Sequence, residues 1–360
     1  MCPPWRAWLA RRFAIAAASS LATPVAIGKR IAPVGVVEVE GYLGTVLNSV
    51  DRLHFPGDCL NHHDVQKFFP TGGWGWYWVG DADRGYNKNQ PGGWIYNTLT
   101  YMEQAALHDL PKDGNPNIAG VAQRNAAMQV VQSPLSIVTC PSRRPANLFP
   151  YNNTSGILNS SLPPTAGRSD YAANSGTRWE EPPWTGNPAT EAFPNSYGVV
   201  ATYTGWWIDS ARAREGTSGI RELTGVSYQR SEVGIRHISD GTSNTYLIGE
   251  KALTTTSYEN GNDSGDNETW CSGFNNDNFR VTAYAEPRAS GLLQQLQPMQ
   301  DAPNYPERGG VRAFGSPHSS GVNMAFCDGS IHLISFSVDW TIHRDLGDIA
   351  DDNPVDISKL

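Results

Sequence analysis

The 360-residue sequence lacks clustered positive charge, which limits the partners that it can bind. Only 17% of its residues are charged, and the formal net charge is −8. A surface that binds nucleic acid needs grouped Lys and Arg side chains. Lys251 and the pair Arg143-Arg144 are too isolated to supply one. We therefore expect no nucleic-acid partner.

The sequence also lacks the short motifs that mark common enzymes. It contains no G-x-S-x-G elbow, no P-loop, no dinucleotide fingerprint and no H-E-x-x-H zinc motif. Ser, His and Asp are so common that a catalytic triple could be assembled from any chain of this length. We predict a protein that is not an enzyme and holds no cofactor. An unrecognised hydrolase is the third alternative, and it would need a nucleophile and a base in contact in a concave site.

Cysteine is sparse and widely spaced. No two of the five cysteines form a C-x-x-C pair, which excludes the usual zinc and redox motifs. The odd count leaves at least one unpaired, and an oxidising compartment would allow up to two bridges. We favour small buried thiols over bridges. The five are Cys2, Cys59, Cys140, Cys271 and Cys327.

No stretch has the roughly 20 apolar residues that a membrane span needs. Basic residues precede a short apolar run at 13–28, and this order resembles a secretory signal. We expect residues 1–57 to be an atypical amino-terminal segment, either an export signal or a frame-shifted region. Residues 59–360 then form a single domain, because no linker divides them.

What the sequence has in abundance is Gly and Pro, with 36 and 25 residues. This composition favours a loop-rich α+β protein over a helical bundle. Apolar spacing and turn residues predict helices that end before Pro70 and that span Ile95–Leu110 and Ala119–Gln132. The strongest strand predictions fall at residues 135–140, 197–207 and Thr245–Gly249.

A β-hairpin is predicted between Phe314 and Ser337. Apolar residues alternate on both sides of Asp328-Gly329, and a type I′ turn there would need positive φ at both central residues. His318 precedes the first arm, so it lies about 20–30 Å from Asp328 in extended chain. The two cannot be a catalytic pair. For His318 we favour a structural hydrogen bond that pins the hairpin, with metal or ligand contact as the alternative and catalysis last.

Two further groups of side chains suggest ligands. Exposed aromatic rings stack on sugars, so a glycan- or solute-binding module is the alternative function. We favour core or subunit contact for these rings, because alternate residues of one strand share a face. The aromatic residues are Trp74, Trp76, Trp78 and Trp94.

The acidic run at residues 259–268 offers oxygen ligands of the kind that calcium prefers. Its candidates are Asp263, Asp266 and Glu268. The run does not follow the EF-hand order, which places Gly at the sixth position and Glu at the twelfth. We favour a solvated loop without a metal.

Seven stretches, taken in order from 59 to 346, resemble a bacterial family of unknown function, domain of unknown function 1559. Members of that family have a prepilin-type amino terminus and a carboxy-terminal motif written H-x9-DG. Each stretch alone is weak, but the ordered set is specific. The stretches are LNHHDVQKFFPTGGWGW, GGWIYNTLTYMEQAALHDL, IVTCPSRRP, SDYAANSGT, ISDGTSNTYLIGEK, WCSGFNNDNFR and FGSPHSSGVNMAFCDGSIHLISFSVD.

The resemblance implies a pilin-like fold, in which amino-terminal helices pack on a mainly antiparallel β domain. It also implies an exported pilin-like or pseudopilin-like protein with a structural role at the cell surface or in secretion. Its partners would be copies of itself or other pilin-like and secretion components. The motif residues, to which we assign structural roles, are His318, Asp328, Gly329, Asp240, Gly241, Asp170 and Tyr171.

The amino terminus departs from the family. Its members begin with a short basic segment, a cleavage and methylation signature and a long apolar helix that anchors the protein in the membrane. Residues 1–57 show none of these features, so the membrane association expected of the family lacks its anchor here. We expect that this segment is not native family sequence and reflects a shifted frame, a mis-assigned start or a replacement.

Overall fold

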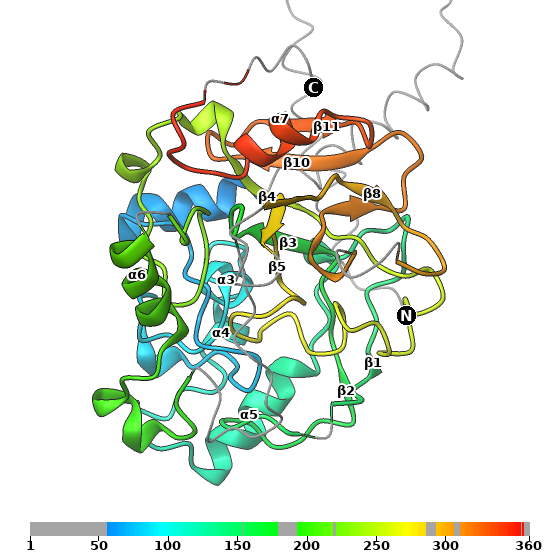
Figure 1. Ribbon diagram of the computed structural model, residues 1–360. Helices are drawn as coiled ribbons and strands as arrows, with labels where there is room; N and C mark the ends of the chain where they lie inside the picture. The colour runs from blue at the N-terminus through cyan, green and yellow to red at the C-terminus, as the bar shows by residue number, and fades with distance from the viewer. Residues whose placement is uncertain are drawn as a thin grey trace, which may run out of the picture. The chain divides into compact units, whose positions relative to one another are not determined.

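The largest sheet of the computed structural model has five strands and runs from β10 and β11, at the top of Figure 1, to β3 and β5 near its middle. The strand order is β11-β10-β4-β3-β5, and every neighbouring pair is antiparallel except β3 with β5. The structure describes residues 56–153, 155–178, 193–218, 221–285, 293–305, 310–353 and 355, all within one unit at 49–360. The sheet strands are β3 (Tyr171–Asn174), β4 (Tyr246–Glu250), β5 (Phe279–Arg280), β10 (Val322–Phe326) and β11 (Ile331–Ile334).

Helices and short two-stranded ladders surround this sheet. Residues 56–66 are also helical. The mixture of helix and sheet is compatible with the predicted α+β class. The other α-helices are α3 (Trp94–Thr98), α4 (Ala105–His108), α5 (Val121–Val131), α6 (Trp207–Ser218) and α7 (Trp340–Asp345). The 3-10 turns are η1 (Ala82–Arg84), η2 (Ser136–Val138), η3 (Tyr197–Thr202), η4 (Ile235–His237), η5 (Thr242–Asn244) and η6 (Gly310–Arg312). The two-stranded ladders are β1 (Phe149–Pro150) with β2 (Thr165–Ala166), β6 (Ala283–Ala285) with β7 (Leu293–Gln295), and β8 (Met299–Gln300) with β9 (Gly315–Ser316).

The sheet separates two apolar clusters. Successive residues of a strand point to opposite faces, so Ala172 joins the smaller cluster and Ala173 the larger. Figure 1 shows α7 lying over β10 and β11, and Leu346, which follows α7, belongs to the smaller cluster. The larger cluster contains the buried tryptophans. Among the described residues, no helix is both long and apolar enough to cross a membrane.

The best-predicted helix is α5. Its buried residues Gln123, Ala127, Val130 and Val131 recur at the spacing of one helical face. The predicted end of a helix before Pro70 is also confirmed by the helical residues 56–66. The expectations for residues 1–55 lie outside the described residues.

Three secondary-structure predictions are wrong. The helix expected over Ile95–Leu110 is interrupted after Thr98, and Glu103 has a positive φ of 59°. The strand expected at 135–140 contains the 3-10 turn η2. The strand expected at 197–207 is instead η3 followed by the start of α6. In the last segment, Tyr197 packs on Trp78 and donates to Asp81, and these long-range contacts override the strand preference of Val and aromatic residues.

The predicted hairpin is present as β10 and β11, but its turn differs from the prediction. The amide of Phe326 donates to the Ser330 carbonyl at 2.9 Å, which leaves three loop residues between this pair. Gly329 has a φ of 88°, whereas Asp328 is not among the described residues with positive φ. This is a tight turn followed by a glycine in the left-handed region, a common three-residue hairpin loop. The predicted type I′ turn is therefore wrong.

Gly329→Val should destabilise the protein by about 1 kcal/mol or more, because a β-branched residue is strained at positive φ. The added Cβ would also lie 2.9 Å from Cδ1 of Leu60. Urea denaturation measures the change. Gly198→Val is the matched control, since a Cβ there has no neighbour within 4 Å. Equal stability of the two variants would show that the turn does not need glycine.

The four cysteines in the described part of the chain, Cys59, Cys140, Cys271 and Cys327, are free and buried. The preference for small buried thiols is therefore confirmed for these four, and Cys2 lies outside the described residues. No bridge links the described cysteines to one another.

Asp58 is a buried carboxyl in the helical residues 56–66, and its Oδ2 makes no hydrogen bond. Burial, and then the charge of Glu103, raises its pKa from 3.8 to about 7. Because its pKa is raised in the folded protein, the contribution of Asp58 to the free energy of unfolding is fully present below about pH 4. This contribution is lost as the pH rises through 7.

We expect Asp58→Asn to stabilise the protein by about 1–2 kcal/mol at pH 8, because it removes a poorly solvated charge. At pH 4 the variant should match the wild type. Urea denaturation at the two pH values measures the difference. Equal stabilities at both pH values would mean that water reaches the carboxylate.

Candidate functional site

Cys140 is positioned by a tight turn after η2. The residues Cys140-Pro141-Ser142-Arg143 form a β-turn in which the Arg143 amide donates to the Cys140 carbonyl at 2.9 Å. Proline is favoured at the second position of such a turn because its ring fixes φ at the value that this position needs. The Cys140 amide donates to Oδ2 of Asp170 at 2.7 Å. Both ends of the cysteine backbone are thus held.

Glu250 lies at the end of β4, with its side chain fully buried. Its Oε2 accepts hydrogen bonds from the Ser316 hydroxyl at 3.0 Å and from Asn323, whose amide N and Nδ2 donate at 2.9 and 2.8 Å. Oε1 lies 3.3 Å from Nε2 of His318. One carboxylate oxygen is therefore fixed by three donors, and the other faces the loop between β9 and β10, which carries His318.

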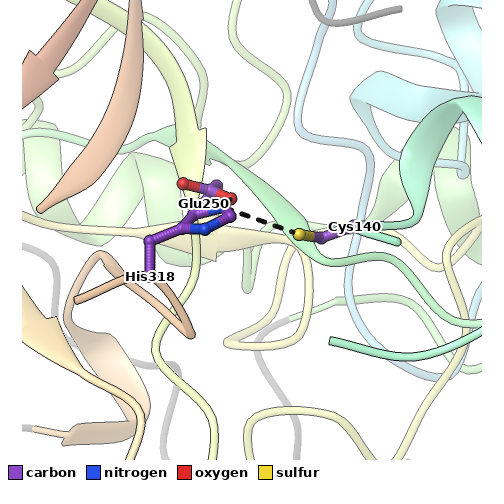
Figure 2. A group of neighbouring side chains, drawn as sticks. All are labelled: Cys140, Glu250 and His318. Atoms are coloured by element: carbon purple, nitrogen blue, oxygen red, sulfur yellow. Dashed lines mark hydrogen bonds and ion pairs between the residues drawn. The ribbon is translucent and has the colours of Figure 1, made fainter. Parts of the chain in front are cut away.

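His318 follows β9 and lies in the loop before β10. Its amide donates to the Ser316 hydroxyl at 3.2 Å, so Ser316 links it to Glu250. Nε2 of His318 lies 3.3 Å from Oε1 of Glu250 and 3.9 Å from Sγ of Cys140. Figure 2 shows the three side chains turned toward one another. The His318 side chain is 22% exposed, so the site reaches the surface on this side.

Burial and charge affect the two acidic groups of this cluster in opposite directions. Burial raises the pKa of Glu250, but contact with His318, the Asn323 amide and the charge of Arg143 outweigh it and lower the pKa to about 2. Burial, and then the Glu250 charge, raises the pKa of the Cys140 thiol to about 11. At neutral pH the cluster therefore contains a carboxylate and a protonated thiol.

The arrangement does not fit nucleophilic catalysis. In a catalytic triad the carboxylate holds one ring nitrogen while the other faces the nucleophile. Here Glu250 and Cys140 both approach Nε2 of His318. A reactive cysteine also has a lowered pKa, whereas the pKa of Cys140 is raised. In the described residues this is the one group of three His, Cys, Asp or Glu whose ligand atoms lie within 4.8 Å of each other.

A buried ionic network adjoins the cluster. Lys251, which belongs to this network, follows Glu250 in the chain, and successive side chains of an extended segment point to opposite sides. Arg143 lies 3.2 Å from Oδ1 of Asp170 and 2.9 Å from Oδ2 of Asp301. Arg144 joins Asp170, at 2.8 Å, to Asp266.

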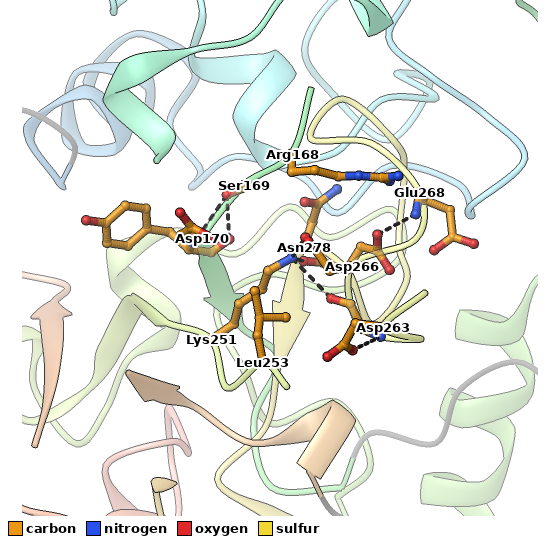
Figure 3. Close-up of polar contacts among 12 residues, drawn as sticks. Arg168, Ser169, Asp170, Lys251, Leu253, Asp263, Asp266, Glu268 and Asn278 are labelled. Atoms are coloured by element: carbon orange, nitrogen blue, oxygen red, sulfur yellow. Dashed lines mark hydrogen bonds and ion pairs between the residues drawn. The ribbon is translucent and has the colours of Figure 1, made fainter. Parts of the chain in front are cut away.

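Lys251 is the best-satisfied cation of this network. Its Nζ donates to Oδ1 of Asp266 at 2.8 Å and to the carbonyls of Gly265 and Asp277 at 3.1 and 2.7 Å (Figure 3). Three partners match the three protons of an ammonium group. Burial raises the pKa of Asp266, but the charges of Arg144 and then Lys251 outweigh it and hold the pKa far below its usual value.

The predicted motif residues make different local contacts. Oδ1 of Asp328 accepts from the amide and hydroxyl of Ser330 at 2.8 and 2.7 Å, so Asp328 serves its own turn. Asp240 accepts from the amides of Asp351 and Asp352 and holds the carboxy-terminal segment. Gly241, with a φ of 97°, begins η5.

Of the remaining motif residues, two lie next to the cluster. Asp170 is shared by Cys140 and the two arginines. Tyr171 begins β3 and pairs with Glu250 in the sheet register. The structure thus brings His318 and Asp170 to one site, while Asp328 and Asp240 fix other parts of the chain.

The four candidate aromatic ligands are buried in the larger core cluster. Trp74, Trp76 and Trp78 lie in irregular chain, so the prediction that they share a strand face is wrong. The indole N–H groups of Trp78 and Trp94 donate to the carbonyls of Pro194 and Asn278, both at 2.8 Å. These rings cannot form an exposed platform for sugars, and the preference for burial is confirmed.

The three calcium candidates are buried, so the prediction of a solvated loop is wrong for these carboxylates, although Glu259, Asn260, Asn262 and Ser264 of the same run are exposed. Asp263 accepts from Thr254 and Tyr305, Asp266 pairs with Arg144 and Lys251, and Glu268 accepts from asparagine side chains. Because each carboxyl has its own protein partners, the three do not form a joint calcium site.

Sequence reasoning did not identify Cys140 and Glu250 as partners of His318. Cys140 and His318 are 178 residues apart, and no spacing rule connects them. The available signal was that each of the three falls in one of the ordered motif stretches, IVTCPSRRP, ISDGTSNTYLIGEK and FGSPHSSGV. Side chains able to bind a metal in three such stretches were candidates for one site.

Comparison with models of protein families matches residues 59–341 to a family described as a protein of unknown function (DUF1559). The match covers most of the chain, so the chain belongs to this family. The family predicted from the ordered stretches is confirmed, and its prepilin-type character stays a prediction. No curated protein and no solved structure matches the chain.

Proposed function

We propose that this member of the DUF1559 family is a non-enzymatic, pilin-like or pseudopilin-like structural protein that is exported and assembles at the bacterial cell surface. The observation that carries this proposal is the packing of the first described helix against the carboxy-terminal hairpin. Leu60 of residues 56–66 approaches Gly329, and Cys59 lies near Cys327. A helix held on an antiparallel sheet is the arrangement that the pilin resemblance implies.

The internal chemistry of the chain supports a structural role. Asp170, Asp266 and Lys251 are buried, and the contacts described above tie them to other parts of the protein. Cys140, Glu250 and His318 lack the relay geometry of a nucleophile and its base. These groups connect distant segments of the chain, which supports a structural role.

Exposed apolar side chains offer surfaces for assembly. Val65, on the helical residues 56–66, is 63% exposed. Leu333 is 49% exposed on β11, which lies at the edge of the five-stranded sheet and pairs there with β10. An outer strand has backbone groups that another chain can pair with. The partners would be further copies of this chain or other pilin-like and secretion components.

Cell fractionation and cross-linking in intact source bacteria test this proposal. We expect the chain in the envelope or extracellular fraction, shortened at its amino terminus and cross-linked into multimers. Val65→Glu should reduce the multimers, whereas Val121→Glu, on another exposed helix position, should not. An unprocessed, monomeric protein in the cytoplasmic fraction would contradict the proposal.

A further inference from the structure

We propose that Cys140, Glu250 and His318 bind one divalent transition-metal ion, with Zn²⁺ as the best fit. This inference goes beyond the structural role proposed above and does not depend on it. Three segments that are distant in sequence bring one sulfur, one oxygen and one nitrogen atom within 4.8 Å of each other. These are the three ligand types that zinc accepts.

Two of the three separations between the ligand atoms are close to those around a tetrahedral ion. Zinc bonds of about 2.3 Å to sulfur and about 2.0–2.2 Å to nitrogen and oxygen place S and N about 3.6 Å apart and N and O about 3.4 Å apart. The observed distances from Nε2 of His318 are 3.9 Å to Sγ of Cys140 and 3.3 Å to Oε1 of Glu250. The third pair, Sγ of Cys140 and a carboxylate oxygen of Glu250, lies within 4.8 Å, and side-chain rotation on binding would bring these two atoms to about 3.6 Å.

The Glu250 carboxylate is prepared for a ligand. Its Oε2 is held by Ser316 and Asn323, while the buried Oε1 faces Nε2 of His318 at 3.3 Å. Partners that fix the second oxygen of a ligating carboxylate are typical of metal sites.

The charges of the site also favour a divalent ion with affinity for sulfur. Binding displaces the thiol proton of Cys140 to solvent, because the thiolate is the ligand. The thiolate and the Glu250 carboxylate then balance the two positive charges of the metal. Calcium and magnesium prefer sites built entirely of oxygen, so the sulfur ligand selects against them.

Zinc titration of the full-length, chelator-treated protein tests this inference, with a chromophoric chelator as competitor. We expect one Zn²⁺ per chain. His318→Gln and Cys140→Ser should each weaken binding by about 100-fold or more, since loss of outer partners alone costs 10–100-fold. His332→Gln is the control, because His332 contacts Ser330 and Phe326 in the same hairpin. It should bind zinc like the wild type.

Cobalt replaces zinc as a spectroscopic probe, and it reports on the sulfur ligand directly. The wild type should show a thiolate-to-cobalt charge-transfer band that Cys140→Ser lacks. Circular dichroism shows whether each variant is folded, and partly exposed His318 provides a substitution outside the core. A wild type that binds no zinc, or folded variants that bind it equally well, would overturn the inference. Neither result depends on where the protein is located in the cell.

Discussion

Replacing Asp266 with alanine should lower the free energy of unfolding by about 3–5 kcal/mol, because it leaves buried cations without their partner. Asp266 accepts from Arg144 and Lys251, and all three side chains are at least 98% buried. Of the two cations, Arg144 retains Asp170, whereas Lys251 retains only carbonyl partners among the described residues. Chemical denaturation at pH 7 measures the loss.

The control is Asp64→Ala, because the Asp64 side chain is 80% exposed. Its effect should not exceed about 1 kcal/mol, as is usual for surface charges. The double variant Asp266→Leu with Lys251→Met should recover part of the lost stability, since it removes both members of the ion pair. A small loss in Asp266→Ala would show that water reaches Lys251 when the carboxylate is absent.

Trp78→Ala should also be destabilising by about 3–5 kcal/mol, through loss of a large buried ring. The Trp78 ring stacks on Tyr197 with centroids 4.8 Å apart and meets Trp74 edge to face at 4.9 Å. Aromatic pairs of this kind add to the energy of simple burial. Thermal and chemical denaturation give the change, and Leu162→Ala, at a 56% exposed residue, provides the control.

Substitution of a neighbouring tryptophan distinguishes a role in the core from sugar binding. If the tryptophans serve the core, Trp76→Ala weakens folding, and a glycan array detects no saturable binding by the wild type. Saturable binding that Trp76→Ala abolishes without changing the melting temperature would contradict burial as the role of these rings. The glycan-binding alternative would then replace the structural one.

Local patterns predicted the elements whose sequence signals are contiguous. The α5 helix follows from apolar spacing, and the β10–β11 hairpin follows from alternation around Asp328-Gly329. Strand β4 starts one residue after the predicted Thr245 and ends one residue after Gly249. In each case the residues that specify the element are close together in sequence.

Predictions failed where distant contacts decide the structure. Residues 197–207 have strand-forming side chains, but Tyr197 packs on Trp78 and donates to Asp81, and the chain turns as η3. Asp266 of the acidic run is buried because it meets Arg144, which is 122 residues away. Long-range pairing of this kind leaves no periodic pattern in a single sequence.

The candidate site was hidden for the same reason. His318 was identified from its motif, but its ring nitrogen meets a carboxylate from β4 and a thiol from the turn after η2. Counting cysteine spacings excluded a metal motif that is contiguous in sequence, and it could not detect ligands that the fold assembles. Only the sheet register and the turn at Pro141 bring them together.

The metal site is tested most directly by a crystal of the full chain grown with Zn²⁺ and measured at the zinc absorption edge. We predict one anomalous peak about 2.0–2.3 Å from Sγ of Cys140, Nε2 of His318 and a carboxylate oxygen of Glu250. Ordered side chains with no peak between them, at a zinc concentration that saturates other zinc proteins, would contradict the account.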